Sequence, residues 1–572
     1  WTFKPSGVYT AVDLIQALKD GLIYVTIDTV NFTSGELRGN FIFATGSQAF
    51  VEPPDPPPLP GGVPTAGEAA RFLSQATFGA TLATIDQVVQ SGYSAWIDSQ
   101  IAIPASSHRA ETAADFAANP TGGAGNNTRP GGVHRQAAWW KIVLKGNDQL
   151  RQRVAFALSE IFVVSDVNST INNWQEGAAN YCDILASHAF GNFRSLLEDV
   201  SLSPIMGTYL SHLRNAKSAN GSFPDENYAR EVMQLFTIGL NQLQPDGSLK
   251  LDSFGLPMPT YDQTTITETA KVFTGWGFYS TQANPNFRTA PADFFNPMMI
   301  YPGSHENASK TIVGGIVLPA NQGGAKDLDD TLDTLFYHTN AAPFFSRALI
   351  QRLVSSNPSP GYVYRVARVF EDNGSGVRGD LAAVVRAVLL DYEARAGDVT
   401  ANPGYGKLKE PLLRMTSLMR AFDAVGSNNR FAISRPEQSI EQASLRAPSV
   451  FNFFEPTYVV PGALASAGLV APEFQILTDT TAIGTPNYIY RFLFNTVNGV
   501  SMDYSAWLPL ASQPQQLTDT LDLVLAAGSS GQVARDTITA ALNSLPASTS
   551  AADRVRSAAY LMLTSPGGSV QK

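Results

Sequence analysis

Apolar residues recur every three or four positions along most of the chain after residue 65, with polar residues between them. This period is typical of amphipathic helices that turn one apolar stripe toward a core. The pattern predicts helices over residues 66–78, 82–101, 133–146, 148–165, 174–199, 225–238, 262–274, 328–338, 341–355, 361–372, 379–392 and 407–423, with two or three more over 517–563. We therefore expect a mainly α-helical fold: one large, multi-helix domain with long irregular loops.

The pattern changes at both edges of this helical region and in its middle. Residues 22–30 and 37–43 are rich in β-branched and aromatic residues and predict two strands joined by a turn over 31–36. Seven prolines between Glu52 and Pro64 favour an extended polyproline II spacer. Residues 276–326 are rich in Pro, Asn, Gly and Phe and predict a long irregular stretch, which in a helical protein is often functional.

These changes divide the chain into three parts. We expect a small β segment over residues 1–50, a proline-rich linker over 51–65 and the helical domain over 66–572. Two strands cannot bury enough surface to be stable alone. We therefore expect the rest of the β-domain to precede Trp1 or to come from elsewhere.

Composition excludes some partners and favours export. The formal charge of the 572-residue chain is −10 and no dense basic run is present, which argues against nucleic acid. Charged residues make up 15%, below the globular average of about 25%, and polar uncharged residues take their place, as we expect of an exported protein. Cys182 is the single cysteine, so no intramolecular disulfide can form. No apolar run approaches the length of a transmembrane helix.

The segment from Asp225 to Gly239 has the clearest helix signals. Asp225 is a good N-cap residue, and Gly239 suits the C-terminal end. Glu226 and Arg230 are spaced for an i, i+4 ion pair, with Glu231 beside them. We expect Arg230 to be largely buried and paired with a carboxylate, the candidates being Glu226, Glu160 and Glu231.

The run from Glu226 to Glu231, Glu-Asn-Tyr-Ala-Arg-Glu, followed by Leu235, Thr237 and Gly239, resembles the central signature of the domain of unknown function 1800 family of large bacterial proteins. Further similar segments follow in family order across residues 66–572: 70–79, 96–98, 153–162, 274–276, 305–310, 409–411 and 448–454. The resemblance implies a fold and a bacterial setting but no established reaction.

Residues 24–29 and 35–39 are similar to the C-terminal hairpin of the CHRD domain, a secreted β-sandwich. This second resemblance implies a cell-surface or extracellular location.

Candidate chemistry is sparse. No G-x-S-x-G, H-E-x-x-H, C-x-x-C or Walker-type motif occurs, and none of the six histidines is paired at helical spacing, so we expect no metal and no cofactor. Glu226, Arg230 and Glu231, with His305 from the irregular stretch, are candidates for an acid/base site. The same charges could instead form ion pairs that lock helices together, and His305 and Lys310 could simply hold their loop in shape.

Phe451, Phe453 and Phe454 are candidates for a sugar-stacking platform or for ordinary core. Lys310 is a further candidate for binding.

Two functions fit these features. The first is an exported envelope or extracellular protein that binds or assembles, with another protein or copies of itself, or an extracellular polymer, as partner. The alternative is a secreted hydrolase whose acid/base site is built from Glu226, Arg230, Glu231 and His305.

Overall fold

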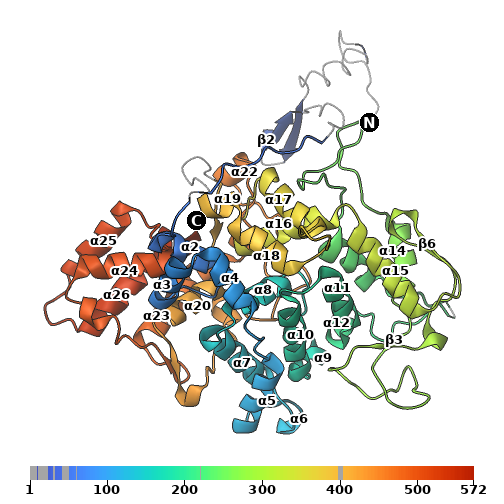
Figure 1. Cartoon of the computed structure of the whole chain (residues 1–572), viewed down its shortest axis with the longest axis horizontal. Coiled ribbons are helices and arrows are strands. Elements are labelled where there is room, and N and C mark those ends of the chain that lie inside the picture. The colour runs from blue at the N-terminus through green and yellow to red at the C-terminus, as the bar shows by residue number, and fades with distance from the viewer. Residues whose placement is uncertain are drawn as a thin grey trace.

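The computed structural model describes residues 10, 24–29, 32–40, 50–59, 61–219, 221–396 and 404–572. Helices dominate this part of the chain, and most of its strands have only two residues (Figure 1). The mainly α-helical fold that the hydrophobic period predicts is confirmed.

The α-helices in chain order are α2 (Ala66–Ala76), α3 (Leu82–Ser91), α4 (Tyr93–Ile101), α5 (His108–Ala118), α6 (Ala124–Asn127), α7 (Gly132–Lys145), α8 (Gln149–Ser159), α9 (Ser169–Asn172), α10 (Gln175–His188), α11 (Phe193–Leu202), α12 (Pro204–Tyr209), α13 (Asn227–Glu231), α14 (Gln263–Ala270), α15 (Gly324–Tyr337), α16 (Ala341–Leu353), α17 (Pro360–Glu371), α18 (Leu381–Leu390), α19 (Tyr392–Ala396), α20 (Pro411–Ala421), α21 (Glu437–Ile440), α22 (Ala463–Ser466), α23 (Asp479–Phe494), α24 (Pro514–Ala526), α25 (Gln532–Asn543), α26 (Ala551–Thr564) and α27 (Pro566–Ser569).

The strands pair two by two, and every pair is antiparallel: β1 (Tyr24–Thr29) with β2 (Phe32–Asn40), β3 (Trp276–Gly277) with β4 (Met299–Ile300), β5 (Lys310–Thr311) with β6 (Val317–Leu318), β7 (Lys407–Leu408) with β10 (Val570–Gln571), and β8 (Val425–Gly426) with β9 (Val500–Ser501). The short strands β3 to β6 all lie within the irregular stretch over 276–326.

Several predicted boundaries are wrong. The helix expected over 82–101 is broken at Gly92, whose φ of 77° ends α3 and begins α4. The helix expected over 174–199 breaks between α10 and α11. The predicted turn over residues 31–36 is too long, because β2 already begins at Phe32, which pairs with Thr29 of β1.

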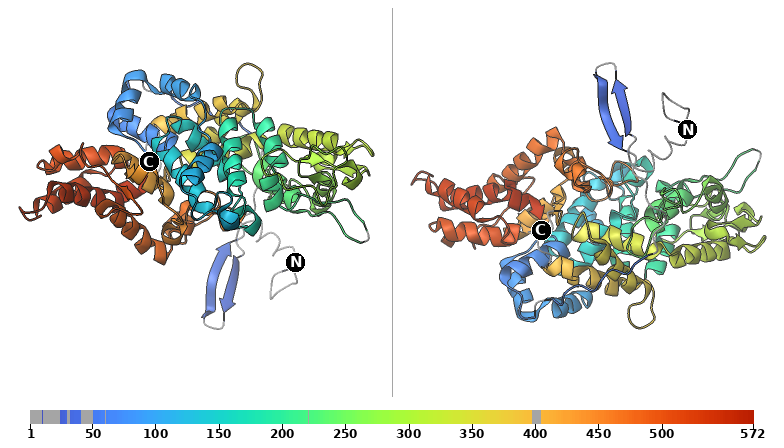
Figure 2. Two further views of the ribbon diagram at one scale, coloured as in Figure 1. Left: turned by 90° about the horizontal axis from the view of Figure 1, so that it is seen from below. Right: turned by 90° about the horizontal axis from the view of Figure 1, so that it is seen from above.

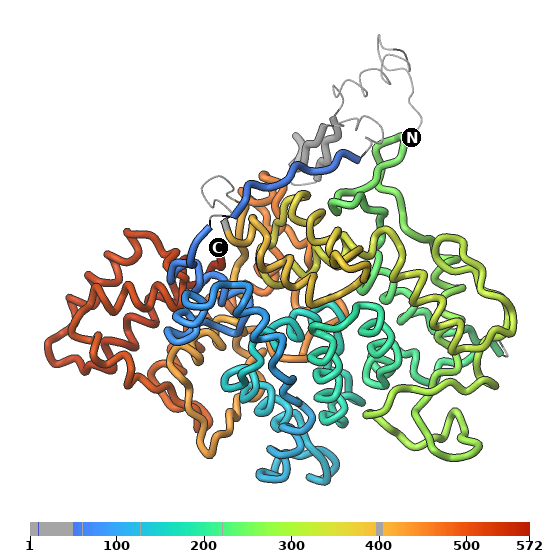
Figure 3. The backbone as a smooth tube through the Cα atoms, viewed as in Figure 1, coloured from blue at the N-terminus to red at the C-terminus, as the bar shows by residue number. Residues whose placement is uncertain are grey.

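A single contiguous hydrophobic cluster runs through the helical body, from Ala69 in α2 to Leu563 in α26. Early and late parts of the chain meet in it: α2 packs against α8, α18 and α24 (Figure 3). The pairing of β10 with β7 ties the last residues to the middle of the chain. Helices α24–α26 form one end of the molecule, and α14 and α15 lie at the opposite end (Figures 1 and 2).

The proline-rich linker has no helix or strand over residues 50–59, in keeping with an extended spacer. Its first residues lie on α17, where the Tyr364 hydroxyl donates to Glu52 Oε1 at 2.8 Å and the ring of Phe50 contacts that of Tyr364. Within the described residues, we find no helix that combines the length and the apolar character needed to cross a bilayer.

Candidate functional site

The helix that carries Glu226, Arg230 and Glu231 is shorter and more irregular than predicted. α13 begins at Asn227, because Asp225 accepts from the Asn227 N–H instead of capping deeper in the turn. After Glu231 the backbone continues as a π-helix, η1 (Val232–Thr237). Gly239 ends it with a φ of 71°, as predicted for a residue just past a helix. Single π-helical turns often occur at functional sites, which draws attention to the segment that follows.

Arg230 is paired but not buried. Its guanidinium lies 3.3 Å from Glu226 Oε2, which confirms the predicted partner, but 38% of its side chain is exposed. The predicted burial of Arg230 is therefore wrong, because its long side chain extends past the apolar stripe to the edge of α14. There Gln263 and Thr267 also donate to Glu226, at 2.7 Å each.

Glu231 is the buried carboxyl of this trio. The residue is 5% exposed, and its carboxylate has no hydrogen-bond partner in the described part of the chain. Burial raises the pKa of Glu231, and the charge of Arg230 opposes that rise only in part. The nearby Tyr261 hydroxyl also has no partner among the described residues, and burial together with Glu231 raises its pKa to about 12.

His305 and Lys310 belong to a separate cluster. Both contact Asp327, His305 through Nε2 at 2.9 Å and Lys310 through Nζ at 2.6 Å, and all three side chains are 1% exposed. His305 Nδ1 also lies 2.8 Å from the Thr274 carbonyl. The ring therefore lies between two oxygens, those of the Thr274 carbonyl and the Asp327 carboxylate. Burial alone would raise the pKa of Asp327, but the two hydrogen bonds outweigh it and lower the pKa.

The structure therefore does not gather the four acid/base candidates. No hydrogen bond or ion pair between described residues joins His305 to Glu226, Arg230 or Glu231. His305 and Lys310 fix the loop before α15, since Lys310 also donates to two loop carbonyls, those of Glu306 and Ala308.

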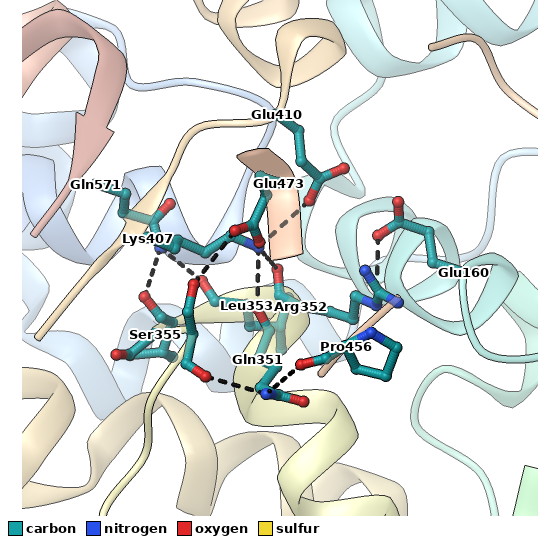
Figure 4. Close-up of polar contacts among 12 residues, drawn as sticks. Glu160, Gln351, Arg352, Leu353, Ser355, Lys407, Glu410, Pro456, Glu473 and Gln571 are labelled. Atoms are coloured by element: carbon teal, nitrogen blue, oxygen red, sulfur yellow. Dashed lines mark hydrogen bonds and ion pairs between the residues drawn. The ribbon is translucent and has the colours of Figure 1, made fainter. Parts of the chain in front are cut away.

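A larger buried charge network lies at the centre of the molecule and was not predicted as a unit. Its ionisable members are three carboxylates and three cations, all nearly inaccessible to solvent: Glu160, Glu410, Glu473, Arg153, Arg352 and Lys407. Lys407 Nζ lies 3.0 Å from Glu473 and 3.3 Å from Glu410, and Arg352 Nε lies 4.0 Å from Glu160 (Figure 4). Glu160, one of the predicted candidate partners of Arg230, belongs to this network instead.

Glu160 is only partly compensated in the network. Its Oε1 accepts from Gln442 and Asn452 at 3.4 and 3.3 Å, whereas Oε2 has no hydrogen-bond partner in the described residues. Burial and the neighbouring Glu410 carboxylate raise the pKa of Glu160 to about 8. Near neutral pH, Glu160 therefore keeps its proton.

The network supports the floor of a surface groove. Lys407 donates to the Gln351 carbonyl at 2.9 Å, and Ser356 donates to Glu473 at 3.2 Å. The Gln351 amide in turn donates to the carbonyls of Ser356 and Pro456 (Figure 4). Gln351, Ser356 and Pro456 all line the groove, so a rigid polar base holds it in shape.

The groove has a volume of about 600 Å³ and is mostly apolar. This volume lies in the range of sites that hold ligands or side chains. Its apolar side chains come from three segments of the chain: Leu240, Leu243, Leu249, Phe344, Leu469 and Val470.

One wall of the groove is a projecting arm, residues 240–260, which follows η1 directly. It consists of three short extended segments, which are joined pairwise by the bridges Asn241–Pro259, Leu243–Leu249 and Leu251–Pro257. Asn340 anchors its base by donating to the carbonyls of Ile238 and Asn241 at 2.8 Å each. The arm carries exposed apolar side chains: Phe254 (74%), Leu256 (61%), Leu240 (53%) and Leu249 (46%).

Sequence reasoning missed the arm and the groove. The signal was present in the spaced leucines of residues 240–256 among Gly, Pro and Asp, which fits neither a helix nor a long strand. What the pattern cannot indicate is that these leucines face solvent.

The aromatic candidates divide between core and surface. Phe453 and Phe454 are buried in a small cluster with Val163 and Ile476, and Arg352 lies over the Phe454 ring at 4.7 Å. Phe451 is 44% exposed. The structure thus leaves one of the three rings open to a partner.

Comparison with known proteins identifies a family whose model names no function. The family model described as "Protein of unknown function (DUF1800)" matches residues 71–567, so the chain belongs to this family. No curated protein matches the chain. No solved structure matches it either.

Proposed function

We propose that this member of the DUF1800 family is a non-catalytic, exported assembly component that associates with copies of itself. The observation that carries the proposal is the pairing of an unpartnered apolar arm with an apolar groove in the same chain. In the proposed contact, Phe254 and Leu256 at the arm tip of one copy enter the groove of the next.

The choice of a second copy as partner rests on this complementarity. The arm tip offers two large apolar side chains, and the groove offers apolar walls over a rigid base formed by Gln351 and Ser356. Burying an exposed phenylalanine and leucine contributes about 1.5–3 kcal/mol each. A contact between two different surfaces of one chain is heterologous, and it generates a ring or an open filament.

Export, to the cell surface or the medium of a bacterium, is the second part of the proposal. It is supported by the CHRD-like pattern of residues 24–39, the proline-rich linker and the low content of charged residues. Fractionation of the native cells tests it: we expect the protein in the envelope or medium. Recovery in the cytosol, from a gene that encodes no export signal upstream, would contradict it.

The hydrolase alternative has weaker geometric support. A general acid and base must both reach one substrate, yet His305 is held by Thr274 and Asp327 in a cluster apart from Glu231. Of the four acid/base candidates, Glu231 is the one that has an unpartnered carboxyl oxygen among the described residues and a raised pKa.

Sedimentation velocity over a wide range of protein concentration tests self-association. We expect the wild-type protein to form larger species as concentration rises, and the Phe254→Ser, Leu256→Ser double variant to stay monomeric. A matched control replaces two exposed apolar residues on other helices, Ile483→Ser and Val533→Ser, and should assemble like the wild type. A wild-type protein that is monomeric throughout, or a double variant that assembles equally well, would contradict the proposal.

A further inference from the structure

A second pocket, of about 280 Å³, opens where the loop before α7 meets residues 434–446. We call it the glycine pocket, because Gly122, Gly123, Gly131 and Gly132 line one side of it. The backbones touch there: a Cβ on Gly131 would lie 2.2 Å from the Gly122 carbonyl oxygen. His134 fixes the turn by accepting the Gly131 N–H through Nδ1 at 2.9 Å.

Two backbone N–H groups and one arginine side chain at the pocket have no partner among the described residues. The N–H groups of Gly132 and Val133 begin the 14-residue helix α7, and neither has an acceptor among the described residues. Such groups, together with the helix dipole, favour an anion. Arg435 also lines the pocket, is exposed, and forms no ion pair with any described carboxylate. Its φ of 54° is a left-handed conformation, which costs free energy in a residue other than glycine.

The acidic group of the pocket is already neutralised. Asp166 is buried, and it accepts from Arg135 at 2.8 Å, Gln175 at 2.9 Å and Arg446 at 2.6 Å. Arg446 also pairs with Glu437. Arg435 and the helix terminus are therefore the charges left for a ligand.

Gln136 lacks a hydrogen-bond donor that a ligand could supply. It lines the pocket and is 3% exposed, its amide nitrogen donates to the Ser444 carbonyl at 3.0 Å, and its Oε1 has no partner among the described residues. A buried acceptor without a donor is costly. A ligand hydroxyl would satisfy it, and Asn172, Asn173 and Ser434 offer further neutral polar groups at the same pocket.

We propose that the glycine pocket binds a small carboxylate that carries hydroxyl groups, of the size of a single hexuronic acid. The carboxylate lies against the start of α7 and Arg435, and a hydroxyl donates to Gln136. This site is separate from the arm and groove, so it goes beyond the proposed function and does not depend on it.

Isothermal titration of the full chain with glucuronate tests the site. Arg435→Ala removes the free cation, and its side chain has no described partner to lose. Gly132→Ala adds a methyl group to the pocket, where the nearest atoms lie at 3.7 Å or more, an ordinary contact that the fold tolerates. Matched controls are Arg491→Ala, another exposed and unpaired arginine, and Gly67→Ala, another glycine in the first turn of a helix.

We expect saturable 1:1 binding of glucuronate that weakens about tenfold or more in Arg435→Ala and Gly132→Ala. Both controls should bind like the wild type, and glucose and acetate should each bind more weakly than glucuronate. Absence of glucuronate binding, or equal binding by all variants, would overturn the proposal. Acetate or inorganic phosphate binding as tightly as glucuronate would show a simple anion site and would also overturn it.

Discussion

At the scale of single residues, the protonation of Glu160 makes the stability of the buried charge network depend on pH. Its pKa of about 8 in the folded protein lies above its ordinary value of 4.5 because it is buried beside Glu410. Between these two values the folded state holds a proton that the unfolded chain releases. The contribution of Glu160 to stability is therefore full below pH 4.5 and is lost as pH rises to about 8, by at most about 1.4 kcal/mol per pH unit.

Glu160→Gln removes this titration while it keeps the acceptor for Gln442 and Asn452. We expect the unfolding free energy of the variant, relative to the wild type, to increase steadily from pH 5 to pH 8. Urea denaturation at each pH unit measures it. The unfolding free energy of the exposed control Glu455→Gln should change with pH as that of the wild type does. If the unfolding free energy of Glu160→Gln also followed the wild type, Glu160 would be ionised in the folded protein.

Arg230 shows how partial exposure limits the contribution of an ion pair to the stability of the protein. Its side chain is 38% exposed and that of Glu226 is 31% exposed, so water screens the pair. We expect Arg230→Ala to lower the unfolding free energy by no more than about 1 kcal/mol. Chemical denaturation at neutral pH measures the change. A loss of about 3 kcal/mol or more, typical of breaking a buried pair, would contradict the exposed position of the side chain.

At the scale of elements, the step from α13 through η1 to the arm determines how the groove is built. Gly239 makes this step possible, because its φ is 71° and an added Cβ would lie 2.8 Å from the Phe344 ring. We expect Gly239→Ala to destabilise the protein by more than about 1 kcal/mol and to weaken self-association, since Phe344 must move. Gly303→Ala, with nothing within 4 Å of its new Cβ, is the control. An unchanged melting temperature and unchanged assembly in Gly239→Ala would show that the groove does not depend on this turn.

Elements also mark where sequence patterns succeed and fail. The 3.6-residue period located most of the long helices because it reports directly which face is buried. It could not place the break at Gly92, since a glycine inside a periodic run is compatible with a helix. It also could not indicate the π-helical turn after Glu231, which depends on tertiary packing rather than on local preference.

At the scale of the whole molecule, the unpredicted features all depend on contacts between distant segments. Glu160 and Lys407 belong to one buried network although about 250 residues separate them, and neither position is distinctive in the sequence. The groove combines the arm with the end of α16 and residues 456–470. A single sequence does not indicate which distant segments come into contact. It does show local features, such as the helix signals around residues 225–239 and the irregular stretch that carries His305.

In the proposed contact the arm tip of one copy enters the groove of another, and disulfide cross-linking tests this contact. Ser253→Cys, beside Phe254 at the arm tip, is placed in one preparation, and Thr457→Cys, at the groove, is placed in a second preparation of different mass. Both substitutions keep the apolar contact residues, and the two preparations are mixed under mild oxidation. The native Cys182 does not interfere, because burial raises the pKa of its thiol to about 12. A second mixture, Ser253→Cys with Val533→Cys, is the control.

We expect from the first mixture a mixed dimer whose mass lies between those of the two homodimers. It should form faster than in the control and be lost on reduction. Equal and slow cross-linking in both mixtures would contradict the proposed contact.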